Sequence, residues 1–175
     1  MTATTAPAVQ RAREFVQDVL MPLEQEAERA AGRLPDATVS EIKHAAIAAD
    51  LHGGRIPTIL GGQGWSMREW FEVNEQFGRV TGGLHWHVPS VYNVWVKASE
   101  QQRERYVRPA LAGEGGDAYA VTEAEAGSDP GGIATTAYPL ADGGWRRING
   151  EKWFVTSGDV ARVLVVMANV VDGSD

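Results

Sequence analysis

Apolar residues recur at steps of three and four along much of the first two thirds of the chain, the spacing that places side chains on one face of an α-helix. This pattern predicts a helix over Val9–Leu23, which Pro22 kinks or ends because proline lacks a backbone N–H. A second helix is predicted after Pro35, with Asp36 as its N-cap and the pair Gly53-Gly54 as its end. The side chains expected to face inward are Val9, Ala12, Val16, Val19, Leu20 and Leu23 in the first helix, and Val39, Ile42, Ala46 and Ala49 in the second.

Two capping-box patterns mark the starts of further helices. Ser66 is followed three residues later by Glu69, and Ser99 in the same way by Gln102, so that each side chain can satisfy a free backbone N–H of the first turn. The first pattern predicts a helix that buries apolar side chains, and the second a helix to about Leu111. The side chains expected inside the first of these are Trp70, Val73 and Phe77.

Two segments around these helices have different patterns. Arg55–Gly64 is rich in glycine and proline and is predicted to be a connecting loop. Leu84–Lys97 is apolar and aromatic on most sides, which predicts a helix enclosed by others, although Pro89 leaves its start open.

The spacing of apolar residues shortens after the glycine-rich stretch 113–116, and β-branched residues gather there. Turns are predicted at Asp142-Gly143-Gly144 and at Asn149-Gly150. The fold class is therefore α+β, a helical domain followed by an incomplete antiparallel β-domain. The expected organisation is a tail over 1–8, a helical domain over 9–115 and the start of a β-domain over 116–175. The predicted strands are Ala118–Thr122, Ala134–Leu140, Trp145–Asn149, Glu151–Thr156 and Val163–Val171.

Composition narrows the classes of partner. The 175 residues carry a net charge of −7 and no long Lys/Arg cluster, which argues against a nucleic acid or an anionic membrane as the partner. The absence of cysteine excludes disulfides and thiolate chemistry, and it is compatible with a cytoplasmic location. The most apolar stretch, Val163–Val171, is far shorter than a membrane-spanning helix, and no secretory signal is evident, so no membrane span is expected.

The densest chemical signal is the stretch Tyr119–Asp129, a predicted strand that runs into a loop of small and hydroxylated residues. Such a loop can present backbone N–H groups and a serine hydroxyl to phosphate oxygens. From composition alone, a strand followed by a solvated turn is the more common structure, so both interpretations stay open at this point.

Four segments in order resemble signatures of the acyl-CoA dehydrogenase family, and the resemblance extends over most of Val9–Asp175. The helix that leads into the β-domain, over 100–114, and the loop with Ile56-Pro57 and Gly61-Gly62-Gln63-Gly64 are similar to family segments. The most specific pair is Thr122-Glu123-x-x-Ala126-Gly127-Ser128-Asp129 and Ile148-Asn149-Gly150-Glu151-Lys152-Trp153-Phe154-Val155-Thr156.

This resemblance implies an FAD site. Phe154 is expected to pack against the isoalloxazine ring and Thr156 to lie near its reactive nitrogen N5, where a hydrogen bond helps the ring to accept a hydride. Alternatively, Trp153-Phe154 are ordinary core aromatics. The chain has Ala124 where the family commonly has proline, and Glu125 adds a negative charge near the expected phosphate loop. The remaining implied contacts are Tyr119, Val121 and Thr122 along the ring, and Gly127 and Ser128 near the pyrophosphate.

Other constellations are weaker. Gly113-x-Gly115-x-x-Ala118 follows a helix and precedes a strand, the reverse of the order that a dinucleotide-binding Rossmann turn needs. His85 and His87, two residues apart, point in different directions on a helix, so no metal site is predicted. Ser128 and Ser157 have no evident histidine and aspartate relay.

The resemblance also implies an activity, the α,β-dehydrogenation of an acyl-CoA thioester with electrons passed to an electron-transfer flavoprotein. In the family the base is a carboxylate from a C-terminal helical domain, so no catalytic residue is assigned in this chain. The chain alone is expected to be inactive, and to form a homo- or hetero-oligomer with a chain that supplies that domain. The alternatives are a flavin-dependent monooxygenase or oxidase of the same architecture and a non-catalytic partner subunit.

Overall fold

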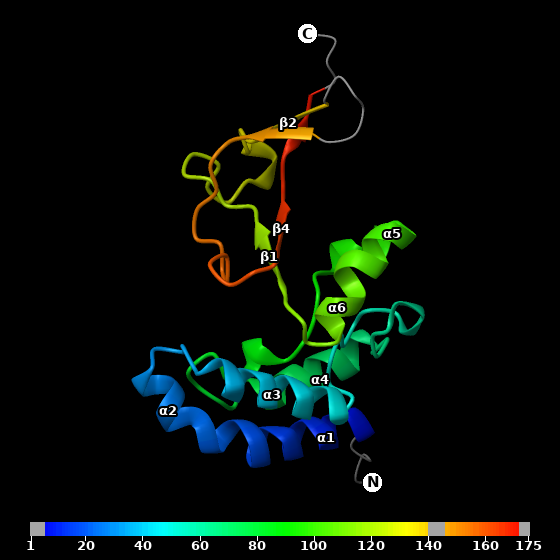
Figure 1. Cartoon of the computed structure of the whole chain (residues 1–175), viewed down its shortest axis with the longest axis vertical. Coiled ribbons are helices and arrows are strands. Elements are labelled where there is room, and N and C mark those ends of the chain that lie inside the picture. Colours follow the sequence, from blue (N-terminus) through cyan, green and yellow to red (C-terminus); the bar gives the residue numbers. More distant parts are fainter. Residues whose placement is uncertain (1–5, 140–145, 172–175) are drawn as a thin grey trace. The chain divides into compact units, whose positions relative to one another are not determined.

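The protein divides into two compact units, residues 1–116 and 117–175, named here the helical unit and the β-unit. The computed structural model describes residues 6–139 and 146–171 (Figure 1). The helical unit contains α1 to α6, and the β-unit contains β1 to β5. The order of helices first and strands second confirms the predicted α+β class. Within the described ranges, no helix is both long and apolar enough to cross a bilayer.

The helical unit begins with one continuous helical run that changes its winding near Pro22. It consists of α1 (Pro7–Phe15), a π-helical turn (Val16–Leu20), a 3₁₀ turn (Met21–Leu23) and α2 (Glu24–Arg29). Pro22 was predicted to kink or end the helix. The helix does not end there, because the run continues to Arg29, but its winding changes at Pro22. Pro22 lies in the 3₁₀ segment, where the winding changes, and its ring nitrogen can donate no hydrogen bond to the preceding π-helical turn.

The second predicted helix is α3 (Asp36–Ala48), and both of its ends differ from the prediction. The N-cap is Pro35, so Asp36 is already the first helical residue and makes no side-chain cap bond. The helix ends before Gly53-Gly54, because Asp50 adopts a left-handed φ of 52°. Leu51 N–H then donates to Ala46 O over 2.9 Å and Asp50 N–H to Ile47 O over 3.0 Å, which is a Schellman motif.

Both predicted capping boxes are confirmed. Ser66 caps α4 (Met67–Phe77) and Ser99 caps α5 (Glu100–Gln102), each with the reciprocal bond from the third helical residue. The run from α5 continues through a π-helical turn (Arg103–Val107) into α6 (Arg108–Leu111), where the sequence predicted its end. Val73 and Phe77 of α4 are buried as expected, whereas Trp70 is only half-buried.

The prediction of an enclosed helix over Leu84–Lys97 is wrong. This segment holds two 3₁₀ turns, Leu84–His87 and Asn93–Lys97, joined by extended backbone. Pro89 explains the break, since proline disfavours the α conformation of the preceding residue, and Val88 has a ψ of 120°. Trp86 is 63% exposed, so the segment is not enclosed. A further 3₁₀ turn, Thr58–Leu60, lies within the predicted loop.

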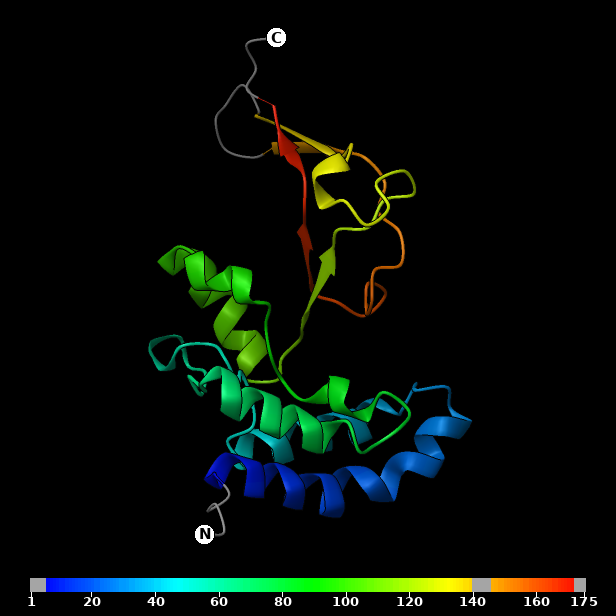
Figure 2. The same cartoon turned by 180° about the vertical axis from the view of Figure 1, so that it is seen from behind.

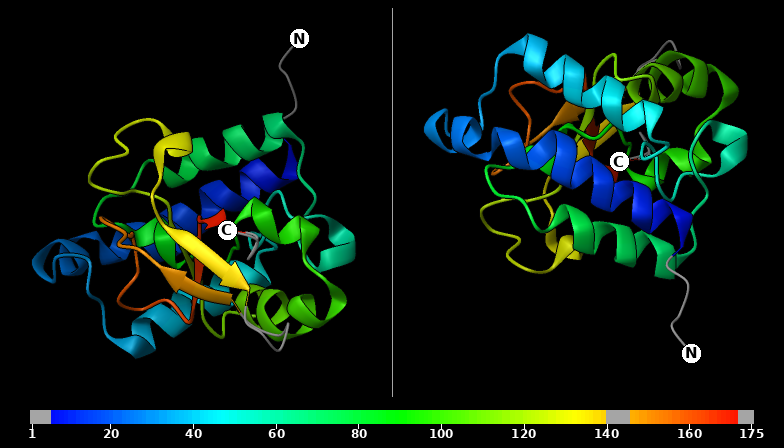
Figure 3. Two further views of the ribbon diagram at one scale, coloured as in Figure 1. Left: turned by 90° about the horizontal axis from the view of Figure 1, so that it is seen from above. Right: turned by 90° about the horizontal axis from the view of Figure 1, so that it is seen from below.

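The main core of the helical unit lies where the N-terminal run packs against α3 and α4 (Figure 3). Phe15 of α1 meets Phe77 of α4 edge to face, with 6.3 Å between the ring centroids. Leu20 and Ile42 are almost fully buried in the same cluster. The predicted 3.6-residue periodicity therefore selected the inward faces of these helices.

The β-unit pairs its strands differently from the prediction (Figure 2). Among the strands that the structure describes, only β2 (Thr136–Pro139) and β3 (Arg146–Asn149) pair in antiparallel fashion. The predicted strand Val163–Val171 is split into β4 (Val163–Val166), parallel to β1 (Asp117–Ala120), and β5 (Asn169–Val170), parallel to β2. The break occurs where the chain changes partner, because Met167 N–H donates to Ala120 O and Asn169 N–H to Thr135 O.

The strand predicted over Glu151–Thr156 is also absent. Phe154 has a φ of 51° and Ser157 a φ of 59°, values that extended backbone cannot accommodate. Asn149-Gly150 consequently ends β3 and does not turn into a paired strand. A short 3₁₀ turn, Pro130–Gly132, precedes β2. The turn predicted at Asp142-Gly143-Gly144 lies outside the described residues, as do Leu140 and Trp145 at the ends of two predicted strands.

Candidate functional site

A buried carboxylate forms the centre of the β-unit's loop region. Glu123 accepts hydrogen bonds from Ala134 N–H over 2.6 Å and from Thr135 N–H over 3.0 Å, and a further one from the Thr135 hydroxyl. Lys152 Nζ lies 2.7 Å from the same carboxylate, and each of the two charged side chains is only 9% exposed. The charge of Glu123 is therefore both paired and surrounded by donors, which is what burial of a charge requires.

The hydrogen bonds to Glu123 stabilise its ionised form. The ammonium group of Lys152, then the Thr135 hydroxyl and the Ala134 N–H, lower the pKa of Glu123 from 4.5 to about 2. Partial burial acts in the opposite direction and is outweighed. Glu123 is consequently an anion throughout the neutral range and does not act as a proton acceptor there.

Acid is expected to weaken the β-unit through this group. The folded-state pKa of Glu123 lies below its unfolded value, so the contribution of its ionised form to stability is fully present above about pH 4.5 and is lost as the pH falls towards 2. We expect the side-chain carboxyl resonance of Glu123 to titrate near pH 2 in an NMR titration. The unfolding free energy of Glu123→Gln is expected to vary less with pH in this window than that of Glu41→Gln, which removes an exposed carboxylate from α3. Titration of Glu123 near pH 4.5 would contradict the assignment.

The two signature segments of the sequence meet in the β-unit. Trp153 N–H donates to Thr122 O over 2.9 Å, and Lys152 Nζ donates to Val121 O over 3.0 Å. These bonds connect the end of β1 to the segment that carries Phe154, although about thirty residues of sequence separate them. The structure thus brings Val121 and Thr122 together with the segment of Phe154, while Tyr119 lies on β1 opposite Val165 and Thr156 follows at an exposed turn.

The two aromatic residues of the second signature are exposed. Phe154 is 87% exposed and Trp153 44%, and their rings meet edge to face with centroids 5.8 Å apart. The alternative that they are core aromatics is therefore wrong for the described β-unit. A phenylalanine at positive φ is rare and strained, and such residues gather at functional sites.

The expected phosphate loop is open to a ligand. Gly127 has a φ of +57°, and a Cβ added to it meets no atom within 4 Å. Ser128 is exposed beside it. Asp129 is held in a turn, since it accepts a hydrogen bond from Gly131 N–H over 2.8 Å. Glu125 is exposed, so its charge is screened by solvent. These features fit a diphosphate bound by backbone N–H groups and a hydroxyl.

The remaining candidates do not form a site of comparable chemistry. Across residues 6–139 and 146–171, no three His, Asp or Glu side chains gather as metal ligands would. His85 and His87 lie on a 3₁₀ turn, and burial lowers the pKa of both, with Lys43 lowering that of His87 further. Gly113 ends the run of α6, and its carbonyl accepts a hydrogen bond from Lys43 Nζ, so it is not part of a phosphate turn.

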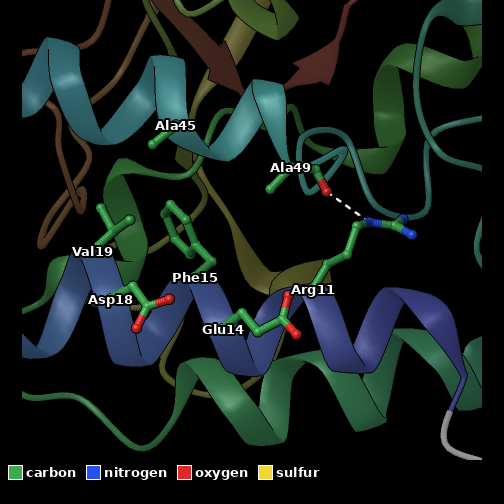
Figure 4. A pocket seen from close by; sticks show the side chains of 7 residues that line it. All are labelled: Arg11, Glu14, Phe15, Asp18, Val19, Ala45 and Ala49. Atoms are coloured by element: carbon green, nitrogen blue, oxygen red, sulfur yellow. Dashed lines mark hydrogen bonds between the residues drawn. The ribbon is translucent and has the colours of Figure 1, made fainter.

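An open groove of about 300 Å³ lies along α1 and α3 (Figure 4). Arg11 crosses it and donates from Nε to Ala49 O over 2.8 Å, so its guanidinium is fixed by the protein itself. None of the signature residues lines this groove. The lining residues are Arg11, Glu14, Phe15, Asp18, Val19, Ala45 and Ala49.

Sequence reasoning missed the roles of Lys152 and Thr135. Each signature contains one partner of the buried ion pair, Glu123 in the first and Lys152 in the second. Opposite charges at fixed places in two paired motifs were the available signal, but their contact depends on the tertiary fold. Thr135 lies outside both motifs, and nothing in its local sequence singles it out.

Comparisons with known proteins agree with the resemblance. Residues 2–114 match the family described as "Acyl-CoA dehydrogenase, N-terminal domain", and residues 118–175 match "Acyl-CoA dehydrogenase, middle domain". The chain belongs to the acyl-CoA dehydrogenase family, whose members are FAD-dependent oxidoreductases. The match confirms the family that the signatures implied, and a solved member of that family is complexed with FAD.

Individual relatives are longer than this chain. It is 28% identical over 162 residues to a 3-(aryl)acrylate reductase of Clostridium sporogenes, a match that covers 90% of this chain and 41% of the relative. It is 33% identical over 121 residues to the caffeyl-CoA reductase-Etf complex subunit CarC of Acetobacterium woodii, a match that covers 66% of this chain and 31% of that relative. The solved acyl-CoA dehydrogenase of Bacillus anthracis complexed with FAD superimposes with a TM-score of 0.75 and 26% identity. This superposition covers 93% of the present chain and 28% of the Bacillus chain. The chain thus spans less than half the length of these relatives.

Proposed function

We propose that this chain provides the FAD-binding segments of an acyl-CoA dehydrogenase-type enzyme. The observation that carries the proposal is the hydrogen-bonded junction between the two signature segments, where Trp153 N–H donates to Thr122 O beside the exposed Phe154. An exposed aromatic ring at a strained backbone position outside any strand is poorly explained by the packing of the β-unit alone. A planar ring stacked on Phe154 would remove its apolar surface from water.

The proposed contacts follow the order of the two motifs. Gly127 and Ser128 bind the pyrophosphate, and Tyr119, Val121 and Thr122 lie along the flavin ring. Phe154 packs against the isoalloxazine, and the Thr156 hydroxyl donates a hydrogen bond near N5. FAD supplies a hydride acceptor when it is bound. The chain's own residues bind and orient it, because Glu123, the buried carboxylate of the junction, has a lowered pKa and not the raised pKa of a general base.

The proposed substrate is an acyl-CoA thioester, and the proposed electron acceptor is an electron-transfer flavoprotein. The name of the Acetobacterium relative, a subunit of an Etf complex, supports that partner. We further propose that the base comes from a segment or companion chain outside these residues, so that this chain alone does not turn over. A homo- or hetero-oligomer in the cytoplasm is the assembly that fits this arrangement.

Reduction of a conjugated double bond is a second candidate for the physiological direction. Two relatives are named as reductases, one of 3-(aryl)acrylate and one of caffeyl-CoA. The same flavin site serves either direction, since the hydride transfer is reversible. Comparing flavin reduction by saturated acyl-CoA with flavin oxidation by arylacrylyl-CoA in the assembled enzyme distinguishes the two.

A titration with FAD, followed by flavin fluorescence, tests the proposal. It uses the purified chain together with any subunit that copurifies. Phe154→Ala is expected to raise the Kd about twofold to twelvefold, because an aromatic stacking contact contributes about 0.5–1.5 kcal/mol. Val160→Ala removes another exposed apolar side chain of the β-unit, which is 75% exposed, and serves as the matched control with unchanged Kd. Absence of FAD binding by the unaltered protein would refute the proposal, and an unchanged Kd of Phe154→Ala would refute the stacking contact.

A further inference from the structure

The buried pair of Glu123 and Lys152 lies at the junction of three chain segments. One segment is the end of β1 with the loop after it, the second leads into β2, and the third follows β3. Each segment contributes a hydrogen-bonding group to the same carboxylate or the same ammonium group. Any movement of one segment relative to the others breaks at least one charge-assisted hydrogen bond.

We propose that Glu123 and Lys152 are positioning residues of the flavin site, which hold the segment of Phe154 in register with Thr122. This inference rests on the proposed function and deepens it. Neither residue touches the flavin in this proposal. They act through the residues beside them, Val121 and Thr122 on one side and Trp153 and Phe154 on the other.

The contacts of Lys152 define the register. Its ammonium group lies 2.7 Å from Glu123 Oε1 and donates to Val121 O over 3.0 Å, so it spans both sides of Thr122. The next residue, Trp153, donates its N–H to Thr122 O over 2.9 Å. Phe154 follows directly in the chain, so its place relative to Thr122 is fixed by three hydrogen bonds from two consecutive residues.

The strained backbone of Phe154 requires such a restraint. Its φ of 51° is unfavourable for a bulky side chain, and the segment 151–156 belongs to no strand that could hold it. A conformation of this kind persists only where surrounding contacts determine it. The bonds of Lys152 and Trp153 to the β1 loop are contacts of this kind.

The carboxylate is itself immobilised from the third segment. Two consecutive N–H groups, those of Ala134 and Thr135, and the Thr135 hydroxyl all donate to Glu123. Lys152 is therefore bound to a fixed anion and not to a mobile surface charge. A shift of the Phe154 segment by one residue would leave a buried charge unpaired, which is the property that lets an ion pair specify one register.

The experiment compares Glu123→Gln, Lys152→Met and the double variant with the unaltered protein. For each, circular dichroism and thermal unfolding measure folding, and a titration measures the Kd for FAD and the visible absorption spectrum of the bound flavin. Each single change is expected to raise the Kd by about tenfold, the size of effect known for groups that orient the ligands of a bound metal, and to shift the flavin band. Glu41→Gln, an exposed charge change on α3, is the control with unchanged Kd and spectrum.

The double variant separates positioning from simple stability. It leaves no unpaired buried charge, so its thermal stability is expected to recover relative to the single variants. If the pair positions the flavin segment, the Kd and the spectrum stay altered in spite of that recovery. If FAD affinity recovers together with stability, the pair is only structural and the inference is overturned.

Two further outcomes are distinguishable. If the unaltered protein binds no FAD, the proposed function fails, whatever the variants do. If it binds FAD and all three variants bind with the same Kd and spectrum, only the positioning role fails. Should the single variants not fold, Thr135→Val removes one donor to Glu123 and keeps the ion pair; an altered flavin spectrum in this variant supports the inference, and an unaltered one overturns it.

Discussion

Gly150→Ala is expected to destabilise the β-unit by about 3 kcal/mol. A Cβ at this position would lie 2.8 Å from both Cα and Cβ of Thr135 and still closer to its hydroxyl oxygen. Thr135 cannot move away freely, because its N–H and its hydroxyl both donate to Glu123. The glycine also has a φ of +154°, which side chains rarely adopt.

Chemical denaturation, followed by the hydrogen exchange of β2 and β3 amides, measures this effect on the β-unit. Gly132→Ala is the matched control in the same unit, since its added Cβ meets only atoms at ordinary contact distances of 3.8 Å or more. FAD affinity is expected to fall with Gly150→Ala and to be unchanged with the control. Equal stability of the two variants would contradict the close packing of Gly150 on Thr135.

Gly62→Ala is expected to destabilise the helical unit by a similar amount, about 3 kcal/mol. Its added Cβ would lie 2.6 Å from Gly53 O, 2.5 Å from Ile56 Cβ and closer still to Ile56 O. These backbone carbonyls hold the loop together, because Gly53 O accepts from Ile56 N–H and Ile56 O accepts from Gly64 N–H. Relief of the overlap therefore requires breaking hydrogen bonds of the loop.

Thermal and urea unfolding of the helical unit measures this change. Gly78→Ala, at the C-terminal end of α4, is the control because its Cβ would be 3.4 Å from the nearest atom and its φ of −68° suits alanine. We expect the control to change the unfolding free energy by less than about 1 kcal/mol. A Gly62→Ala variant as stable as the control would show that the loop can open without cost.

The helical unit was predictable where the signals were local. Capping boxes at Ser66 and Ser99 connect residues only three positions apart, so their chemistry is complete within the sequence. The inward positions of Leu20 and Ile42 follow from periodicity alone. Helix ends were less predictable, because Asp50 rather than a glycine takes the left-handed position after α3.

The β-unit was predictable in composition and less so in pairing. β-branched residues indicated strands, yet whether Val163–Val171 pairs with β1 or β2 depends on contacts across more than thirty residues. The segment after β3 has strand-like composition, but its bonds to Thr122 and Glu123 hold it in another conformation. Such contacts outweigh the strand propensity of the individual residues, because that propensity mostly reflects the surroundings of a residue in the fold.

The sequence by itself determined the order of helices and strands, the helix starts capped by Ser66 and Ser99, and the two motifs that place the chain in its family. These depend on residues close together along the chain, whose interactions are the same in almost any fold. Only the tertiary structure decided that Glu123 meets Lys152, that Gly150 packs closely on Thr135, and that Phe154 is exposed. Such contacts join residues separated by up to 29 positions, and their stability comes from burial and charge pairing that exist only once the chain has folded.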